Sequence, residues 1–439
     1  EVGLLDASAP NAPHDHDEIY LRVASFVPDL VGLHLKTLNV QPAYALAASL
    51  AGFTLVAGGP HATIVPEEPL ARGFSYVIRG EGEDTLVELA DAIDTLYGRN
   101  TRPDVSIMDI AGLSWKARSM VRHNPARPFN TDLDRLAPPL SALDLFEPSW
   151  YPAMSAASLA PAGILSSRGC PAACTFCSND VTGRKFRYRS ARSVAEEVAL
   201  LRERHGLHGF SFFDDSFAVG KRRVRELCDA IAGIGAPVWW TCTAHPAHLD
   251  RDVLADMKRA GCSGVDIGME SADPDMLVRI GKGVTVERVL DVLAWCKELD
   301  IHTVVNLMFG WPDETDAELD ATIGFLDRAA PIAGGFNARG VVVPYPGTKI
   351  YAQNHERFGF TGWWIREAPL EYPAFPTRWD EAEIRRAYAA DPALDRNFFR
   401  HPPARVARIR QALATKADAT LAITRQRASN IGVPAAGAR

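Results

Sequence analysis

The chain has 439 residues, of which 47% are hydrophobic and 23% are charged, a composition typical of a globular protein of about two or three domains. Its formal net charge is −7 and acidic and basic residues are interspersed, which argues against nucleic acid or an anionic membrane surface as a partner. No apolar segment approaches the roughly 20 residues that span a bilayer and the first residues lack the features of a signal peptide, so we expect a cytoplasmic protein.

The first hundred residues alternate β-rich segments with helical ones. The predicted strands cover residues 30–35, 53–59 and 76–80, and the predicted helices cover residues 43–50 and 83–96. This order predicts an α/β domain over residues 1–100, a doubly wound Rossmann-like sheet with helices on both faces. Ligands of such sheets bind beyond the carboxyl ends of the strands, so a binding crevice is expected there.

Residues 101–160 are rich in proline and show little periodicity, which predicts a linker with one small hairpin. From residue 161 the alternation of strand and helix resumes for six rounds. The predicted strands cover residues 163–167, 209–213, 238–243, 264–269, 302–309 and 336–343, and the predicted helices cover residues 193–204, 221–234, 251–260, 286–299 and 316–329. Six units are too few for a closed eight-stranded barrel but suit a partial (β/α)6 barrel over residues 161–365.

The carboxyl-terminal region, residues 366–439, has a weaker pattern. Helices are predicted at residues 380–389 and 403–413, so this region is expected to be a small helical piece. The last 20 or so residues are expected to be disordered.

Three cysteines, Cys170, Cys174 and Cys177, form a C-x3-C-x2-C segment directly after a predicted strand. Iron-sulfur clusters usually have four cysteine ligands, and no fourth cysteine lies nearby. The segment therefore predicts a cluster with one iron open to an exogenous ligand. Two alternatives remain from spacing alone: a zinc site completed by a distant histidine such as His205, or thiols that only pack.

The other four cysteines are separated along the chain and have apolar neighbours. We expect Cys228, Cys242, Cys262 and Cys296 to be free thiols buried as small hydrophobic side chains. The odd total of seven and the crowding of three suit metal ligation in a reducing compartment better than a disulfide framework.

The segment RGCPAACTFCS at residues 168–178 resembles the signature loop of the radical S-adenosylmethionine (SAM) superfamily, in which an aromatic residue precedes the third cysteine. Later segments resemble that superfamily as well: FFDDSF at 212–217, GMES at 268–271, GWPDET at 310–315 and PYPGT at 344–348. The resemblance implies a 4Fe-4S cluster, held by the three cysteines, that reductively cleaves SAM.

The same resemblance implies which residues bind SAM. Glu270 is expected to bind its amino group, Phe176 to border the adenine, and Asn306 to contact the ribose or the carboxylate. The implied set is completed by Ser178, Asp215 and Ser271.

Helix capping is an alternative role for the carboxylates of this set. Glu270 could cap a helix after Asp273, and Asp214 and Asp215 could cap the helix that opens near Gly220. A functional role for the pair is favoured by their position at the carboxyl end of a predicted barrel strand.

Four amino-terminal segments, PDLVG at 28–32, TLN at 37–39, GGPH at 58–61 and GEGE at 80–83, resemble the cobalamin-binding domain attached to one radical SAM subfamily. The segment RNFFRHP at 396–402 resembles the carboxyl-terminal element of that subfamily. The implied cobalamin-binding residues are Thr37, Asn39, Gly58, Gly59, His61, Gly80, Glu81 and Gly82. Taken alone, the glycines are equally well explained as tight turns between strands and helices.

Two departures from the subfamily pattern stand out. The family's domain normally has an earlier strand and helix before the segment that matches residues 1–7, so a truncated start or a missing sheet edge is expected. No D-x-H-x-x-G loop is present, so no histidine is marked as the lower cobalt ligand. His34 and His61 are expected to be ordinary polar residues.

The resemblance as a whole implies a cobalamin-dependent radical methyltransferase. One SAM would methylate cob(I)alamin, and a second would yield the radical that abstracts hydrogen from an unactivated carbon of a small-molecule, lipid or natural-product substrate. An external one-electron reductant such as flavodoxin or ferredoxin is then required, and no catalytic acid or base is assigned. The alternatives are a cyclisation, oxidation or rearrangement with the same cofactors, and a non-catalytic cobalamin or iron-sulfur sensor.

Overall fold

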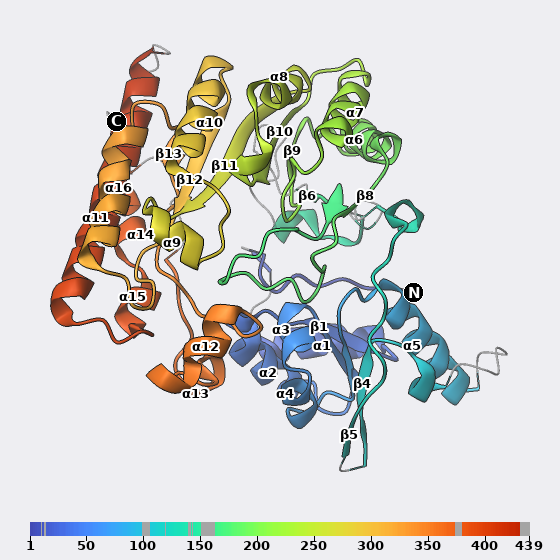
Figure 1. Ribbon diagram of the computed structural model, residues 1–439. Helices are drawn as coiled ribbons and strands as arrows, with labels where there is room; N and C mark the ends of the chain where they lie inside the picture. The colour runs from blue at the N-terminus through green and yellow to red at the C-terminus, as the bar shows by residue number, and fades with distance from the viewer. Residues whose placement is uncertain are drawn as a thin grey trace.

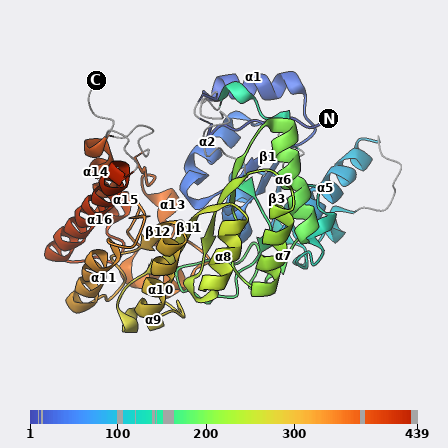
Figure 2. The same cartoon turned by 90° about the horizontal axis from the view of Figure 1, so that it is seen from above.

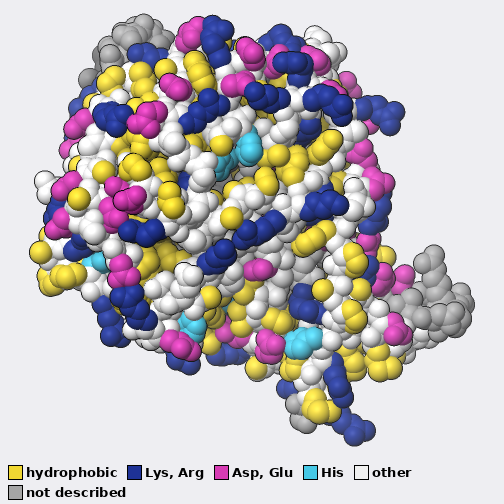
Figure 3. Space-filling view, in the orientation of Figure 1, with side chains coloured by type: hydrophobic (Ala, Val, Ile, Leu, Met, Phe, Trp, Pro, Cys, Tyr) yellow, Lys and Arg dark blue, Asp and Glu magenta, His cyan; other side chains and the backbone are white. Residues whose placement is uncertain are grey.

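The computed structural model describes residues 1–9, 11–12, 15–98, 106–118, 120–138, 142, 144–150, 163–373 and 380–430. Two sheets dominate it, one in each half of the chain (Figure 1). The helices after residue 380 lie beside the second sheet, whereas those between residues 349 and 366 lie near the helices of the first. No helix in these ranges is long and apolar enough to cross a membrane. On the face drawn in Figure 3, acidic and basic side chains are interspersed.

The amino-terminal sheet has five strands in the order β1-β2-β3-β4-β5. Its parallel part consists of β1 (Val31–His34), β2 (Leu55–Gly58) and β3 (Tyr76–Ile78), and its antiparallel part of β4 (Leu113–Ala117) and β5 (Met120–His123). The helices of this half are α1 (His16–Phe26), α2 (Val40–Ser49), α3 (Pro60–Ile64), α4 (Glu67–Ala71) and α5 (Glu83–Leu96). Alternate residues of β2 belong to two different apolar clusters, so both faces of the sheet are covered, as predicted.

The hairpin of β4 and β5 continues this sheet within the segment that the sequence suggested as a linker. Leu113 is fully buried and packs with Ile110 and Leu89 of the same apolar cluster. The linker thus contributes two strands to the amino-terminal sheet, and a boundary at residue 100 would cut through its core.

The second sheet is a partial barrel of six parallel strands in the order β13-β12-β11-β10-β9-β6, which confirms the predicted architecture. Its strands are β6 (Gly163–Ile164), β9 (Gly209–Phe212), β10 (Trp239–Ala244), β11 (Cys262–Glu270), β12 (His302–Leu307) and β13 (Gly335–Phe336). Its helices are α6 (Ala191–His205), α7 (Lys221–Ala232), α8 (Arg251–Arg259), α9 (Pro274–Arg279), α10 (Val286–Glu298) and α11 (Asp316–Ala329). Figure 2 shows α7, α8, α10 and α11 in an arc outside the strands.

The prediction for the last strand is wrong in length. A strand over residues 336–343 was expected, but β13 ends at Phe336, and only Val341 bridges back to the sheet, at Phe309. The apolar residues that suggested a longer strand are buried under the carboxyl-terminal helices instead, and Val342 is 1% exposed.

The carboxyl-terminal region is helical, with α12 (Lys349–Phe358), α13 (Trp363–Arg366), α14 (Glu381–Ala389), α15 (Pro392–Arg396) and α16 (Pro403–Asn430). The helix predicted at 403–413 is longer than expected, because Leu413, Ala417 and Leu421 continue a buried stripe at helical spacing. The expected disorder of the last 20 residues is therefore wrong up to Asn430, and residues 431–439 lie outside the described residues.

A lysine, Lys416, lies fully buried on this stripe. Its ammonium group donates to the side-chain oxygen of Asn337 at 3.2 Å and to the carbonyl of Arg339 at 3.4 Å, and it lies 5.6 Å from the ring centre of Phe309. Burial lowers the pKa of Lys416 to about 7, because the charged form loses its hydration.

Replacing Lys416 with methionine is expected to flatten the pH dependence of stability. Between about pH 7 and pH 10 the unfolded lysine binds a proton that the folded one has lost, so the free energy of unfolding rises with pH in this window. Across this pH window, we expect the free energy of unfolding of the wild type to rise by roughly 3–5 kcal/mol more than that of the Lys416→Met variant. Urea unfolding at several pH values measures this, with exposed Lys297→Met as the control. Parallel curves for wild type and Lys416→Met would contradict it.

Candidate functional site

The three cysteines lie in a loop whose base is a two-stranded antiparallel ladder, β7 (Ser167–Arg168) and β8 (Arg187–Tyr188). Gly169 starts the loop with φ +85°, and a side chain there would meet the carbonyl oxygen of Lys185 at 2.5 Å. Only glycine fits this left-handed position, so the residue before Cys170 fixes the turn into the loop.

The two aspartates after β9 hold the loop and its base in place. The carboxylate of Asp215 accepts from the backbone N–H of Gly169 and from the hydroxyl of Thr182, both at 2.8 Å. The buried carboxylate of Asp214 accepts from the backbone N–H groups of Ser166 and Ser167 at 2.7 and 3.1 Å and from both of their hydroxyls. The capping alternative for the pair is wrong, because the N-cap of α7 is Gly220, which makes no side-chain cap.

The thiols of the loop differ in exposure: Cys174 is buried, Cys170 is partly buried and Cys177 is exposed at its surface. Burial raises the pKa of the Cys174 thiol, because the charged thiolate loses hydration there. Thiolates are the form that binds metal, so cluster binding is accompanied by release of the thiol protons.

The remaining cysteines are buried, as predicted: Cys228, Cys242, Cys262 and Cys296 are at most 3% exposed. Among the residues that the structure describes, no three His, Cys, Asp or Glu side chains surround one metal position, the three loop cysteines included, so this finding does not separate zinc from a cluster. The position of His205 does argue against the zinc alternative. His205 is the last residue of α6 and precedes β9, so it lies toward the amino ends of the strands, while the loop lies at their carboxyl ends.

Glu270 ends β11 at the same carboxyl side of the barrel, with φ +72° after a register shift. Its carboxylate is buried and accepts a hydrogen bond from the ammonium group of Lys282 at 3.0 Å. Gly268 makes room for this pair, since a side chain there would lie 2.5 Å from the Glu270 carboxylate. Asp273, not Glu270, caps α9, so the capping alternative is wrong for Glu270 as well.

Lys282 is a residue of this site that sequence reasoning missed. It is 7% exposed and its positive charge acts on Cys174 and Cys177 as well as pairing with Glu270. The only sign of it in the sequence is that it stands between two glycines, Gly281 and Gly283, and the structure shows that both adopt positive φ.

The other residues implied to bind SAM lie in two different settings. Phe176 packs edge-to-face on Trp311 with 5.4 Å between ring centres, and the hydroxyl of Ser178 donates to Asp180 at 2.8 Å. Asn306 is paired in register with Gly268, on the partly exposed side of β12. Ser271 stands apart: it is fully buried, and its hydroxyl is bonded to Thr322 and to the backbone N–H of Asp273.

The concave side of the barrel is small and polar. On β11, Val265 and Ile267 are buried against the helices, whereas Asp266 between them is exposed on the opposite side. The strand register places Asp266 between Thr243 of β10 and Val304 of β12. Asp266 is therefore a carboxylate on the concave side of the barrel, flanked by the shorter side chains of Thr243 and Val304.

The crevice is predicted at the carboxyl ends of the amino-terminal strands, where Gly58 and Gly80 lie. A side chain added at either glycine would meet nothing within 4 Å, so no neighbouring atom crowds the backbone there. Gly59 has φ +97°, and a side chain there would lie 2.7 Å from the His34 ring, so glycine is required for a different reason. Gly82 is the N-cap residue of α5.

The polar residues predicted to border this crevice are bonded within the protein. His61 is fully buried, and its ring nitrogens lie 3.1 Å from the Thr37 hydroxyl and 3.2 Å from the Glu68 carboxylate. The side chain of Asn39 accepts from the backbone N–H of Lys36 at 2.7 Å. His61 is thus a structural polar residue, as expected, and not a preformed cobalt ligand.

Glu68 connects the two halves of the molecule. It also accepts from the Tyr44 hydroxyl at 2.9 Å and from the indole N–H of Trp364 in α13 at 3.0 Å. Gln41 of α2 donates to the carbonyl of Trp364 at 2.8 Å beside it.

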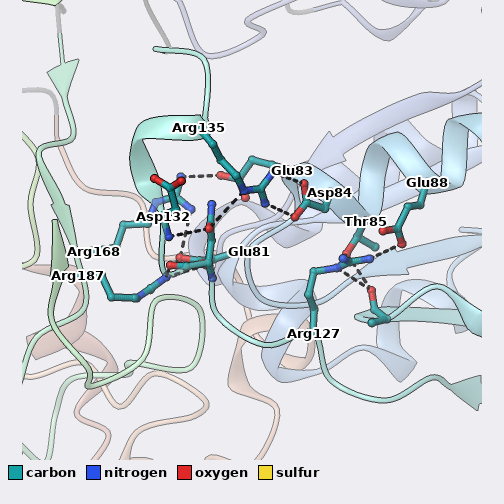
Figure 4. A network of polar contacts seen from close by, with 12 residues as sticks. Glu81, Glu83, Asp84, Thr85, Glu88, Arg127, Asp132, Arg135, Arg168 and Arg187 are labelled. Carbon is teal, nitrogen blue, oxygen red and sulfur yellow. Dashed lines mark hydrogen bonds and ion pairs between the residues drawn. The ribbon is translucent and has the colours of Figure 1, made fainter. Parts of the chain in front are cut away.

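Glu81, also predicted to bind cobalamin, points to the barrel instead. Figure 4 shows its carboxylate between the guanidinium groups of Arg168 and Arg187. The ion-pair distances are 3.1 Å to Arg168 and 2.8 Å to Arg187. The role implied for Glu81 is therefore not supported by its surroundings.

Comparison with known proteins agrees with this geometry. Residues 164–326 match the family model of the radical SAM superfamily, and residues 1–90 match that of the B12-binding domain. The uncharacterized methyltransferase PH0819 of Pyrococcus horikoshii is 33% identical over 80% of this chain and 74% of its own length. The chain is a radical SAM enzyme with a B12-binding domain.

Other proteins are similar over most of the chain. The bacteriochlorophyllide d C-12(1)-methyltransferase of Chlorobaculum tepidum is 28% identical over 76% of this chain and 68% of its own. The radical SAM methyltransferase TsrM of Kitasatospora setae, solved with cobalamin and a [4Fe-4S] cluster bound, superposes with a TM-score of 0.63 at 21% identity, over 80% of this chain and 71% of that one. The likeness to TsrM shows the shared fold.

The cofactors of this radical SAM enzyme are therefore a 4Fe-4S cluster, SAM and cobalamin. The residues present fit them. Three thiols in one loop, with the other cysteines buried elsewhere, suit a cluster with an open iron. The open backbone at Gly58 and Gly80 suits a corrin ring laid against the strand ends.

Proposed function

We propose that this radical SAM enzyme is a cobalamin-dependent methyltransferase that methylates an unactivated carbon of a small-molecule, lipid or natural-product substrate. The observation that carries the proposal is the direct contact between the two cofactor regions. Glu81, in the turn that borders the glycine crevice, is ion-paired with Arg168, two residues before Cys170. A methyl group and a substrate radical can then be brought to one place, as the similarity to proteins named methyltransferases supports.

When bound, one SAM gives its methyl group to the cobalamin and leaves as S-adenosylhomocysteine, while a second is split with an electron from the cluster into methionine and a 5′-deoxyadenosyl radical that takes the substrate hydrogen. Two electrons from an external one-electron protein donor balance the sequence. We place the enzyme in the cytoplasm, where the three thiols stay reduced.

The residues of this chain have separate parts in the proposal. Cys170, Cys174 and Cys177 hold the cluster, and Asp215 positions their loop through Gly169. Residues that border the SAM site are Phe176, Ser178, Glu270, Lys282 and Asn306. Gly58, Gly59 and Gly80 line the corrin crevice, with Thr37 and Asn39 behind it. The substrate occupies the polar concave face beside Asp266, where no general base is needed for hydrogen abstraction.

The test is anaerobic reconstitution with iron, sulfide and cobalamin, followed by mass spectrometry of the SAM products under reduction. We expect 5′-deoxyadenosine in all reduced samples and S-adenosylhomocysteine only when cobalamin is bound. Formation of 5′-deoxyadenosine alone, whether or not cobalamin is bound, would remove the methyltransferase proposal and favour a cyclisation, oxidation or rearrangement. Failure to form either product with an intact cluster would favour a sensor.

A further inference from the structure

The base of the cysteine loop brings two arginines face to face. Arg168 of β7 and Arg187 of β8 are direct partners in the antiparallel register of the ladder. The side chain of Arg187 is 3% exposed and that of Arg168 is 18% exposed. Like charges opposite each other on neighbouring strands are destabilising, and burial increases the cost. This ladder therefore requires a negative partner that it does not itself contain.

The amino-terminal half supplies two carboxylates: Glu83, the first residue of α5, lies 2.5 Å from Arg168, and Glu81 is the one that reaches both arginines. Its side chain is 6% exposed and lies within ion-pair distance of both guanidinium groups. Its second oxygen accepts from Arg187 at 2.9 Å and from the backbone N–H of Asn130 at 2.8 Å. Arg187 also donates to the carbonyl oxygen of Thr182, inside the cysteine loop, at 2.6 Å. One carboxylate thus joins the crevice turn, the ladder and the loop.

Two neighbouring ion pairs in Figure 4 do not extend to the ladder. Arg127 pairs with Glu88, and Arg135 pairs with Asp84. Both carboxylates lie on α5, both arginines follow the β4–β5 hairpin, and each of these carboxylates is more than a third exposed. Neither pair contacts the ladder, so they serve as natural controls for the same chemistry.

We infer that Glu81, through Arg168 and Arg187, is a positioning residue that fixes the cysteine loop relative to the cobalamin crevice and so sets the efficiency of methyl transfer between the two cofactor sites. The inference rests on the proposed function. Cleavage of SAM at the cluster needs only the barrel half, whereas methyl transfer to cobalamin needs both halves in register. Displacement of reacting groups by about 1 Å can cost on the order of a hundredfold in rate.

The test compares Glu81→Gln and Glu81→Asp with wild type and with Glu88→Gln. Glu81→Gln removes the negative charge. Glu81→Asp keeps the charge on a side chain that is one methylene shorter, so this variant is expected to fold even if Glu81→Gln does not. In reduced, cobalamin-loaded enzyme we expect the ratio of S-adenosylhomocysteine to 5′-deoxyadenosine to fall about tenfold or more in Glu81→Gln and about threefold in Glu81→Asp. Glu88→Gln should leave the ratio unchanged.

A readout without cofactors separates this inference from the proposed function. Hydrogen exchange of the apoprotein should show lost protection in Glu81→Gln at both the turn of residues 79–83 and the loop of residues 169–187, and no change there in Glu88→Gln. If the wild type forms no S-adenosylhomocysteine, the proposed function fails. The exchange result still shows whether Glu81 holds the turn and the loop together. An unchanged product ratio in both Glu81 variants, whatever the total turnover, overturns the inference.

Discussion

Cys174→Ala should lose the iron-sulfur cluster and with it the formation of 5′-deoxyadenosine. Cys174 is the most buried of the three loop thiols, at 8% exposure, and the loop holds no spare ligand. We expect at least about a 100-fold loss, since even removing a hydrogen-bond partner of a metal ligand costs about 10- to 100-fold. Iron and sulfide analysis, visible absorption and mass spectrometry of SAM products measure it.

Cys296→Ala is the matched control. Cys296 is fully buried on α10, so the same atoms are removed from the protein core and stability falls by about 1 kcal/mol. Cluster content and SAM cleavage should stay at the wild-type level. A Cys174→Ala protein that still carries a full complement of iron would contradict the assignment of this loop.

Asp214→Ala should have the largest effect on stability. The buried Asp214 carboxylate accepts four hydrogen bonds from Ser166 and Ser167 and lies 3.5 Å from the buried guanidinium of Arg223. Its removal leaves Arg223 without a compensating charge and the junction of β6 and β7 without acceptors. We expect a loss of about 3–5 kcal/mol in the free energy of unfolding, measured with a chemical denaturant on the apoprotein.

An exposed pair provides the comparison for Asp214. Asp229 of α7 lies 2.7 Å from Arg259, with side chains 59% and 48% exposed. Asp229→Ala should cost no more than about 1 kcal/mol, because solvent screens such pairs. Equal costs for Asp214→Ala and Asp229→Ala would show that the buried carboxylate does not hold the strand junction.

The fold was predictable where short-range patterns decide the structure. The helices α5 and α11 match the predicted ranges to the residue, because apolar residues recur at helical spacing and Thr315 with Glu318 forms a capping box at the start of α11. The predictions for β13 and α16 were wrong in length, because in both regions burial depends on contacts between β13, α16 and α14. The stripe of Leu413, Ala417 and Leu421 was present in the sequence, but these long-range contacts decide which apolar residues of the two regions are buried.

In the candidate site, too, local sequence patterns were predictive and long-range contacts were not. The cysteine spacing predicted the loop from the sequence alone, and the glycine turns predicted the crevice. The partners of individual side chains were not predictable, because Glu68 meets Trp364 and Glu81 meets Arg187 across long stretches of chain. The pairing of Glu270 with Lys282 was likewise invisible, since it depends on the missing side chain at Gly268.

Two of the polar contacts between the halves have a consequence for protein engineering. Glu81 meets Arg187, and Glu68 meets Trp364, with buried atoms on each side. A barrel expressed alone would expose an unpaired Arg187 and a bare indole, and a chimera with a foreign B12-binding domain would bury them against the wrong neighbours. Substrate range is therefore better altered on the concave face around Asp266 than by exchanging whole domains, which would have to carry both sets of contact residues with them.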